Sequence, residues 1–525
     1  MDTKALRQKV LDLAIRGKLV PQDPNDEPAS VLLERIRQQK QQMVKGGNLK
    51  AKDIKNDSII FVGEDNLHYE KFANGSVKCI EDEIPFDLPD GWAWARLQSI
   101  TSLLTDGTHK TPKYSGDGYI FLSSRNVTSG RIDWDNIMYI PEALHQELYA
   151  RLAPKVGDIL LAKNGTTGVA AIVDREEAFD IYVSLALIRI VENTIDPLYV
   201  LRAIGSSYIQ DYFNSSLKGI GVPNLHLEHI RKTLLPIPPY SEQNRIVSRV
   251  DLLLPLLEQI ADDEKELHRL VSASKAKILN LAIRGQLVPQ DPADEPASVL
   301  LERIRAEKEE LIRQGKIKRD KRESVIFRGE DNSYYVRQDT HTESIDDQFI
   351  FDLPDNWNWC SLLNVAKIEL GKTLDSVKNT GTNHPYLRSV NVRWNEVDLA
   401  DLKEMRFEPE EIDRYTVRRN DLLICEGGDV GRSCVWTDEK EILYQNALHR
   451  VRFYGECNPF YFMYYMMYYE SRGIIKALCK GVTIKHLTGN VLSLIPFALP
   501  PLEEQGRIVE RLNQIFALLD TILCD

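Results

Sequence analysis

Loops rich in hydrogen-bonding and positively charged side chains follow short apolar runs in the first half of the chain. Residues 106–114 read DGTHKTPKY, residues 121–127 read FLSSRNV, and residues 157–168 read GDILLAKNGTTG. Arg, Lys, Asn, Gln and hydroxyl side chains on loops are the groups that contact base edges and phosphates in DNA complexes. These segments therefore indicate nucleic-acid recognition by hydrogen bonds and ion pairs.

The candidate contact residues form two sets, one in each half of the chain. Arg125 and Arg388 lie near corresponding positions after an apolar run, which makes them the strongest candidates for reading a base. For part of each set, the alternative is a solvated surface side chain. The first set is Thr108, His109, Lys110, Thr111, Ser124, Arg125, Asn126, Lys163, Asn164, Thr166 and Lys218. The second set is Lys372, Arg388, Ser389, Asn391, Arg432, Gln445, Asn446, Lys480, Lys485 and His486.

Catalytic motifs are not evident. Residues 237–240 read IPPY, close to the [DNS]-P-P-[YF] motif of amino-methyltransferases, but Ile237 cannot accept a hydrogen bond from the target amino group. The repeat of this segment, LPPL at 499–502, lacks the aromatic residue as well. The glycines of GTTG at 165–168 favour a tight turn, because no GxxxxGK[ST] phosphate loop is present. We expect a protein without its own cofactor or active site.

Cysteine and histidine spacing gives no metal site. The seven cysteines include no CxxC pair, and the histidines include no HExxH pair. This pattern fits free thiols in a reducing compartment. No apolar run reaches the roughly 18–20 residues that cross a bilayer, and the residues after Met1 do not resemble a signal peptide. We expect a cytoplasmic protein.

The net charge of -12 is unevenly distributed. Residues 95–235 hold 14 Lys and Arg against 15 Asp and Glu, and residues 360–498 hold 18 against 18. The excess acid therefore lies between and around these two blocks. Near-neutral blocks can still present a basic face to DNA, while acidic segments suit protein partners.

The chain contains a duplicated unit. Residues 14–37 read AIRGKLVPQDPNDEPASVLLERIR, and residues 282–305 differ from them at two positions. FDLPDGWAW at 86–94 matches FDLPDNWNW at 351–359, and the PP-x-x-EQ-x-RIV pattern occurs at 238–247 and 500–509. Between these motifs, residues 95–235 and 360–498 share little beyond glycines and apolar positions. Similar segments indicate common partners, and divergent segments indicate different targets.

A long helix is expected to join the two halves. Its apolar positions alternate in steps of four and three, which is a heptad seam. The C-terminus repeats the first half of this seam and the N-terminus repeats the second half, so we expect the two ends to pack beside the central helix. The alternative is that the seam packs on its own globular domain. The seam residues are Ile246, Val250, Leu253, Leu257, Ile260, Leu267, Val271, Ile278 and Leu281.

The divergent blocks are expected to be α+β domains, since each mixes short β-rich runs with one helical stretch, at about 198–214 and 460–478. Tryptophans Trp92, Trp94, Trp357 and Trp359 are expected in the domain cores. The predicted division is a conserved N-terminal region (1–85), a first recognition domain (86–240), a central region with the long helix (241–350), a second recognition domain (351–500) and a C-terminal helix (501–525).

The two copies of AIRGKLVPQDPNDEPAS, the tryptophan motifs and the PP-x-x-EQ-x-RIV pattern together resemble the specificity subunits of type I restriction-modification systems. The resemblance covers essentially the whole chain. It implies two target recognition domains that read the halves of a split, asymmetric DNA sequence. A pair of antiparallel coiled-coil helices would separate them, with the repeat arranged circularly about a pseudo-two-fold axis.

The same resemblance implies partners. Two modification (methyltransferase) subunits would bind the repeated segments, and restriction subunits with translocase and nuclease activity would join them. S-adenosylmethionine, ATP and Mg²⁺ would belong to those partners. The helical ruler from Arg245 to Leu281 would measure about 55 Å at 1.5 Å per residue, roughly one and a half turns of DNA.

Two alternatives remain open from the sequence. One is a non-catalytic coiled-coil scaffold whose two domains bind proteins. The other is a self-sufficient DNA methyltransferase, against which the absent cofactor motifs argue.

Overall fold

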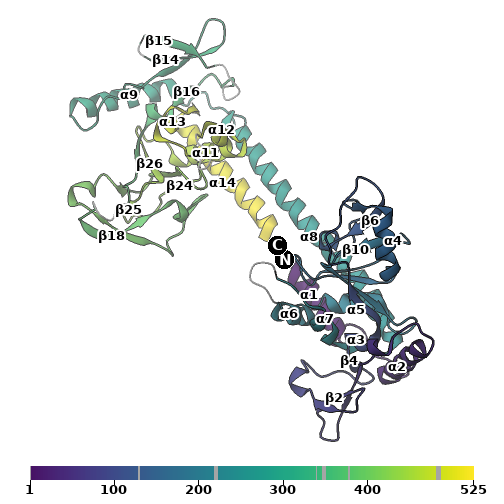
Figure 1. The fold of residues 1–525 in the computed structure, drawn as a ribbon. Helices are drawn as coiled ribbons and strands as arrows, with labels where there is room; N and C mark the ends of the chain where they lie inside the picture. Colours follow the sequence, from purple (N-terminus) through teal and green to yellow (C-terminus); the bar gives the residue numbers. More distant parts are fainter. Residues whose placement is uncertain are drawn as a thin grey trace. The chain divides into compact units, whose positions relative to one another are not determined.

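The computed structural model describes residues 2–127, 130–217, 223–338, 340–345, 351–375, 379–479 and 486–524 (Figure 1). The chain divides into two compact units, residues 1–264 and 265–525. Each unit combines helices with small sheets, which confirms the predicted α+β class.

The first unit is built around a four-stranded antiparallel sheet in the order β5-β11-β8-β9. Strand β8 is buried along its whole length, as a central core strand should be. A second sheet, β10-β6-β7, pairs β10 with β6 in parallel. The strands are β1 Ser58–Val62, β2 His68–Phe72, β3 Val77–Cys79, β4 Ala93–Arg96, β5 Thr101–Asp106, β6 Tyr119–Leu122, β7 Met138–Ile140, β8 Ile159–Ala162, β9 Ala170–Ile172, β10 Phe179–Ile181, β11 Leu185–Ile190 and β12 Leu234–Ile237.

Helices flank these sheets in the first unit (Figure 1). They are α1 Thr3–Ile15, α2 Ala29–Lys45, α3 Leu97–Ile100, α4 Glu142–Arg151, α5 Pro197–Ile204, α6 Ser207–Ser215, α7 Leu227–Lys232 and α8 Tyr240–Ile283, which continues into the second unit.

The second unit repeats this topology. Its main sheet has the order β17-β26-β23-β24, and a second sheet, β21-β18-β25-β22, pairs β18 with β25 in parallel. The strands are β13 Val325–Arg328, β14 Tyr334–Gln338, β15 His341–Ser344, β16 Asn358–Ser361, β17 Ala366–Leu370, β18 Thr382–Leu387, β19 Val392–Arg393, β20 Glu396–Val397, β21 Lys403–Phe407, β22 Thr416–Val417, β23 Leu422–Cys425, β24 Ser433–Val435, β25 Ile442–Tyr444, β26 Leu448–Phe453 and β27 Pro496–Leu499. The helices are α9 Ala297–Arg313, α10 Leu362–Val365, α11 Pro459–Ser471, α12 Ile474–Leu478, α13 Gly489–Leu494 and α14 Leu502–Cys524.

Each predicted helical stretch of the divergent blocks is two helices. The stretch at 198–214 breaks between α5 and α6 at Gly205 and Ser206, and the Ser206 hydroxyl donates to the carbonyl of Ala203 at 2.6 Å. The stretch at 460–478 breaks at Gly473, whose φ of 72° is left-handed. Glycine adopts this conformation without steric cost and so ends a helix.

Helix α8 is continuous through Pro255, and each of its ends packs beside a terminal helix. In the first unit Arg7 of α1 contacts Glu258, while Asp26, later in the chain, contacts Arg245, so the two segments run antiparallel. In the second unit Lys275 pairs with Asp520, and Gln290 donates to Glu504, so α14 also runs antiparallel to this segment.

The seam of α8 is shared between the terminal helices and the globular cores. Ile246 and Val250 lie in one apolar cluster with Leu11 of α1 and with core residues of the main sheet such as Ile190. In the second unit the buried face differs from the predicted seam: Leu279 and Ile283 belong to the corresponding cluster, and Ile278 only packs against it. The predicted seam residues Ile260 and Leu267 are 39% and 37% exposed, so the seam is not buried in the middle of the helix. The expected helix pairing and its alternative, packing on the globular domain, therefore both hold at the ends of the helix.

Candidate nucleic-acid interface

Five segments that are distant in sequence meet at one end of the strands in the first unit. Thr108, after β5, exchanges backbone hydrogen bonds with the end of β10 through Ile181 and Val183, at 3.0 Å each. The amide of Tyr182 donates to Leu122 at the end of β6 at 2.9 Å. Lys163, after β8, donates its amide to Ser184 at 2.8 Å. The same Lys163 carbonyl accepts from Leu225 at 2.9 Å. The structure thus brings the loops of the first candidate set together.

The second unit builds the same frame. The amide of Asn446 donates to the carbonyl of Lys372 at 2.8 Å, and Gln445 donates to Leu387 at the end of β18 at 3.0 Å. Glu426, after β23, donates to Ala447 and accepts from Leu487, both at 2.9 Å. Backbone bonds between corresponding segments therefore recur in both units, while the side chains differ.

A glycine makes this close approach possible in each unit. A Cβ atom on Gly107 would lie 1.9 Å from the carbonyl oxygen of Ile181, and one on Gly371 would lie 2.2 Å from that of Gln445. No side chain fits at such distances, so both positions require glycine.

A buried asparagine in each unit shapes the corresponding turn, Asn126 after β6 and Asn391 after β18. The Asn126 amide oxygen accepts from the Ser123 amide at 3.0 Å, and its nitrogen donates to the carbonyls of Asp133 and Asn136. Asn391 makes the same bonds with Arg388, Asp398 and Asp401. Both side chains are buried, so their amides hold the turn and are not available to contact bases.

The asparagine bonds also correct the alignment of the two arginines. Asn126 corresponds to Asn391, so Arg388 occupies the position of Ser123, and Arg125 occupies the position of Val390. Arg388 ion-pairs with Asp401 at 2.8 Å. The two strongest candidates from the sequence are therefore not equivalent residues.

Two candidate lysines are buried in ion pairs. The Lys163 ammonium lies 2.6 Å from a carboxylate oxygen of Asp106, and the other oxygen of Asp106 lies 3.3 Å from His109. Lys372 contacts both Glu408 and Glu411, and its ammonium lowers the pKa of Glu408 to about 2. Buried lysines with carboxylate partners position the loops and do not present charge to DNA.

The remaining candidates differ in exposure. Arg432 is largely buried and donates to the Ser389 carbonyl at 2.9 Å. Lys218, Lys480 and Lys485 lie outside the described residues. His109, Lys110, Thr111, Arg125, Thr166 and His486 are exposed. Thr108, Ser124, Asn164, Ser389, Gln445 and Asn446 are half-buried at the same strand ends.

Sequence reasoning missed Asp106, Tyr182 and Ser184. Asp106 positions His109 and Lys163, the Tyr182 hydroxyl lies 3.3 Å from that of Thr111, and the Ser184 hydroxyl accepts from the Ser124 amide at 3.0 Å. The signal that could have found Asp106 is its place at the end of a strand next to an obligatory glycine.

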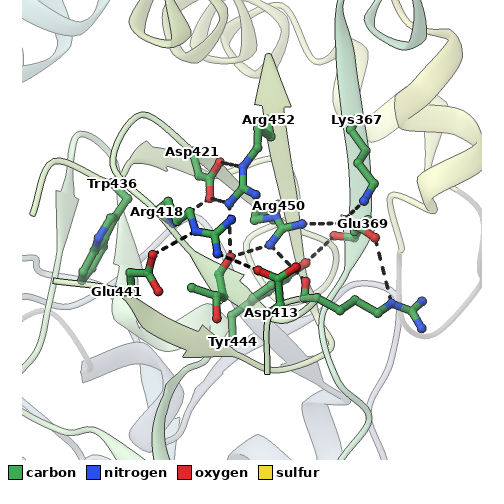
Figure 2. A network of polar contacts seen from close by, with 12 residues as sticks. Lys367, Glu369, Asp413, Arg418, Asp421, Trp436, Glu441, Tyr444, Arg450 and Arg452 are labelled. Carbon is green, nitrogen blue, oxygen red and sulfur yellow. Dashed lines mark hydrogen bonds and ion pairs between the residues drawn. The ribbon is translucent and has the colours of Figure 1, made fainter. Parts of the chain in front are cut away.

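A network of arginines fixes the loop that carries Lys372's partners in the second unit. Figure 2 shows Arg450 between Glu369 and the loop; its guanidinium contacts Glu369 and donates to the carbonyls of Arg414 and Thr416. Beside it, Arg452 forms a bidentate pair with Asp421 at 2.6 and 2.7 Å. In the first unit, Arg189 and Asp158 form the pair that corresponds to Arg452 and Asp421. The residue that corresponds to Arg450 is Leu187, as the strand registers show.

The repeated motifs that flank each divergent block contact one another. Strand β4 pairs with β12, and β16 pairs with β27, so the first and last strands of each block lie together. Arg245 and Asp26 form an ion pair at 2.7 Å, matched by Arg507 and Asp294 at 2.5 Å. All four predicted core tryptophans are buried, namely Trp92, Trp94, Trp357 and Trp359, which confirms their core role. Internal packing thus explains these near-identical motifs.

Comparison with known proteins decides between the remaining interpretations. The family model for the type I restriction modification DNA specificity domain matches residues 89–267 and 354–523, well over half of the chain. The chain belongs to the type I restriction-modification specificity family. The resemblance inferred from the sequence motifs is confirmed.

Relatives cover nearly the whole chain. The EcoAI specificity subunit of Escherichia coli is 26% identical over 98% of this chain and 88% of its own length. The EcoEI specificity subunit of Escherichia coli is also 26% identical, over 99% and 90%. A solved chain from a study of complex assembly and conformational transition of the type I R-M system has a TM-score of 0.52 at 20% identity. It covers 84% of this chain and 93% of that one, which supports the same fold.

As a member of this family, the chain is a sequence-specific DNA-binding specificity subunit and not a catalytic one. In the described ranges, no group of His, Cys, Asp or Glu side chains is arranged to hold a metal ion. The helices of those ranges include none with the length and apolar character of a membrane span.

Proposed function

We propose that this specificity subunit reads a bipartite, asymmetric DNA sequence, with residues 86–240 reading one half and residues 351–500 the other. The supporting observation is the frame of five segments, which recurs in both units with different side chains at its surface. Tyr182 and Gln445, both half-buried, occupy the same place in this frame, while Thr108 takes the place of the buried Lys372. Unlike donors and acceptors in the same backbone frame suit unlike bases.

The repeated segments, 1–85, 241–350 and 501–525, are proposed to bind two methyltransferase subunits, which restriction subunits join. Both copies expose one apolar side chain at the same place, Val31 and Val299, 48% and 38% exposed. A shallow groove of about 490 Å³ beside Val20 and Pro21 is lined on α8 by Leu252. Two like surfaces suit two copies of one partner.

The chemistry is assigned to those partners. S-adenosylmethionine would bind the methyltransferase subunits, and ATP and Mg²⁺ the restriction subunits, with the complex acting on double-stranded DNA in the cytoplasm. The named relatives are subunits of type I restriction enzymes, which supports this division of labour.

The proposal is tested by mapping methylated positions across host DNA with and without this chain, co-expressed with its genomic neighbours. A split motif with unlike halves and a fixed gap, lost on deletion, is expected. Exchanging residues 95–235 for those of another reader should change one half of the motif. Methylation that persists unaltered after deletion would overturn the proposal and favour a protein scaffold.

A further inference from the structure

The turn after β6 and the turn after β18 hold one side chain each in an equivalent, outward position. The buried amides of Asn126 and Asn391 fix both turns with matching hydrogen bonds at identical spacing, so Arg125 and Val390 are placed by the same backbone. Both side chains are exposed, Val390 to 51%. The exposed valine offers an apolar surface where the first domain offers a guanidinium.

Positions 125 and 390 lie beside the frame of five segments that meets at the strand ends. A Cβ atom on Gly165, in the glycine turn after β8, would lie 3.9 Å from the Ser124 hydroxyl oxygen, next to Arg125. In the second unit, the residue before Val390 also lies beside the glycine turn: the Ser389 carbonyl accepts from Arg432, directly after the corresponding turn. The two side chains therefore project from equivalent places in the two loop clusters.

The charge of Arg125 is available, whereas that of the buried Lys163 is not. Among the described residues Arg125 makes no ion pair, whereas Lys163 is neutralised by Asp106. In the second unit Arg388 and Arg432 are paired with Asp401 and Asp429. The two arginines that contact this turn, Arg388 and Arg432, are thus already held by carboxylates.

We propose that position 125 in the first domain and position 390 in the second are equivalent specificity-determining positions that read different chemistry. Arg125 donates two hydrogen bonds to the O6 and N7 acceptors of a guanine, and Val390 packs on the C5-methyl group of a thymine. This inference rests on the proposed function and deepens it by naming one residue for each half-site. Because the two turns have matching hydrogen bonds, the difference between the domains at this position lies in the side chain.

The test measures base preference directly. The full chain, assembled with its methyltransferase subunits, is used to select duplexes from a library randomised at every position of the motif. Arg125→Val should lower the preference for guanine at one position of the first half by roughly 5- to 150-fold, and leave the second half unchanged. Val390→Arg should create a guanine preference at one position of the second half.

A matched control is Arg406→Val. Arg406 is exposed on β21, where it pairs with Asn383 near the start of β18 and away from Leu387 at its end, and its replacement should leave both halves unchanged. An Arg125→Val complex that selects the wild-type motif, or that loses affinity equally for all sequences, would overturn the inference, the second result marking a phosphate contact. Failure of the wild-type complex to select any motif would instead overturn the proposed function.

Discussion

The indole nitrogen of Trp92 donates to a carboxylate oxygen of Glu242 at 3.0 Å, in the interior of the first unit. Trp357 and Glu504 repeat this contact at 2.9 Å in the second unit. Each pair joins the start of a divergent block to the helix that follows it. Burial raises the pKa of Glu242 and of Glu504, so each carboxylate depends on its donor.

Trp92→Phe is expected to lower the free energy of unfolding by about 1–3 kcal/mol, because it leaves a buried carboxylate oxygen without its donor. Trp357→Phe should have a similar effect. Urea denaturation followed by fluorescence of the remaining tryptophans measures both. Wild-type stability in the two variants would contradict a structural role for the repeated motifs.

Gly107→Ala is expected to destabilise the first unit by about 1–3 kcal/mol or more and to abolish selective DNA binding, because the new Cβ cannot lie 1.9 Å from a carbonyl oxygen. Gly116→Ala is the matched control, since a Cβ there meets no atom within 4 Å. Thermal unfolding and duplex binding are compared for the two variants. Equal behaviour would argue against the close contact of β5 and β10.

Lys110 and Lys163, in the loops at the strand ends of the first unit, should behave differently in DNA binding. Lys110 is exposed, so Lys110→Ala should reduce the slope of log affinity against log salt by about 0.9 if it contacts one phosphate. Lys163→Met should leave this slope unchanged but cost about 3–5 kcal/mol of stability, because it strands the buried Asp106 carboxylate. A reduced slope with intact stability for Lys163→Met would show that Lys163 contacts DNA.

The pair of Lys40 and Asp57 should make the free energy of unfolding depend on pH. Burial raises the pKa of Asp57 to about 6, although the Lys40 ammonium lies 2.6 Å away. The folded carboxyl therefore holds its proton more tightly than the unfolded one. The resulting stabilisation is complete below about pH 4 and is lost as the pH rises through 6.

The unfolding free energy of the wild type relative to Asp57→Asn should accordingly fall by up to about 2–3 kcal/mol between pH 4 and pH 7. Urea titrations of both full chains at several pH values in this range measure the difference. A difference that stays constant, or grows with pH, would contradict the raised pKa.

The sequence predicted the duplicated α+β plan because repeated motifs and apolar spacing are local signals. The tryptophan motifs and the long helix could be located for the same reason. Contacts between residues that are distant in the sequence could not be predicted from such local signals. Lys163 stands in a polar loop and looks exposed, yet its partner Asp106 lies 57 positions away in the sequence. Arg388 looks equivalent to Arg125 until the asparagine bonds set the register two residues apart.

The most direct test of the account replaces residues 360–498 with a second copy of residues 95–235. This exchange keeps the repeated motifs, including Trp357 and Glu504, that hold each block in place. Sequencing of methylated host DNA should then show a motif whose two halves have the same base sequence. A motif that keeps the wild-type second half, in a chain shown to fold and assemble, would contradict the claim that each domain reads one half-site.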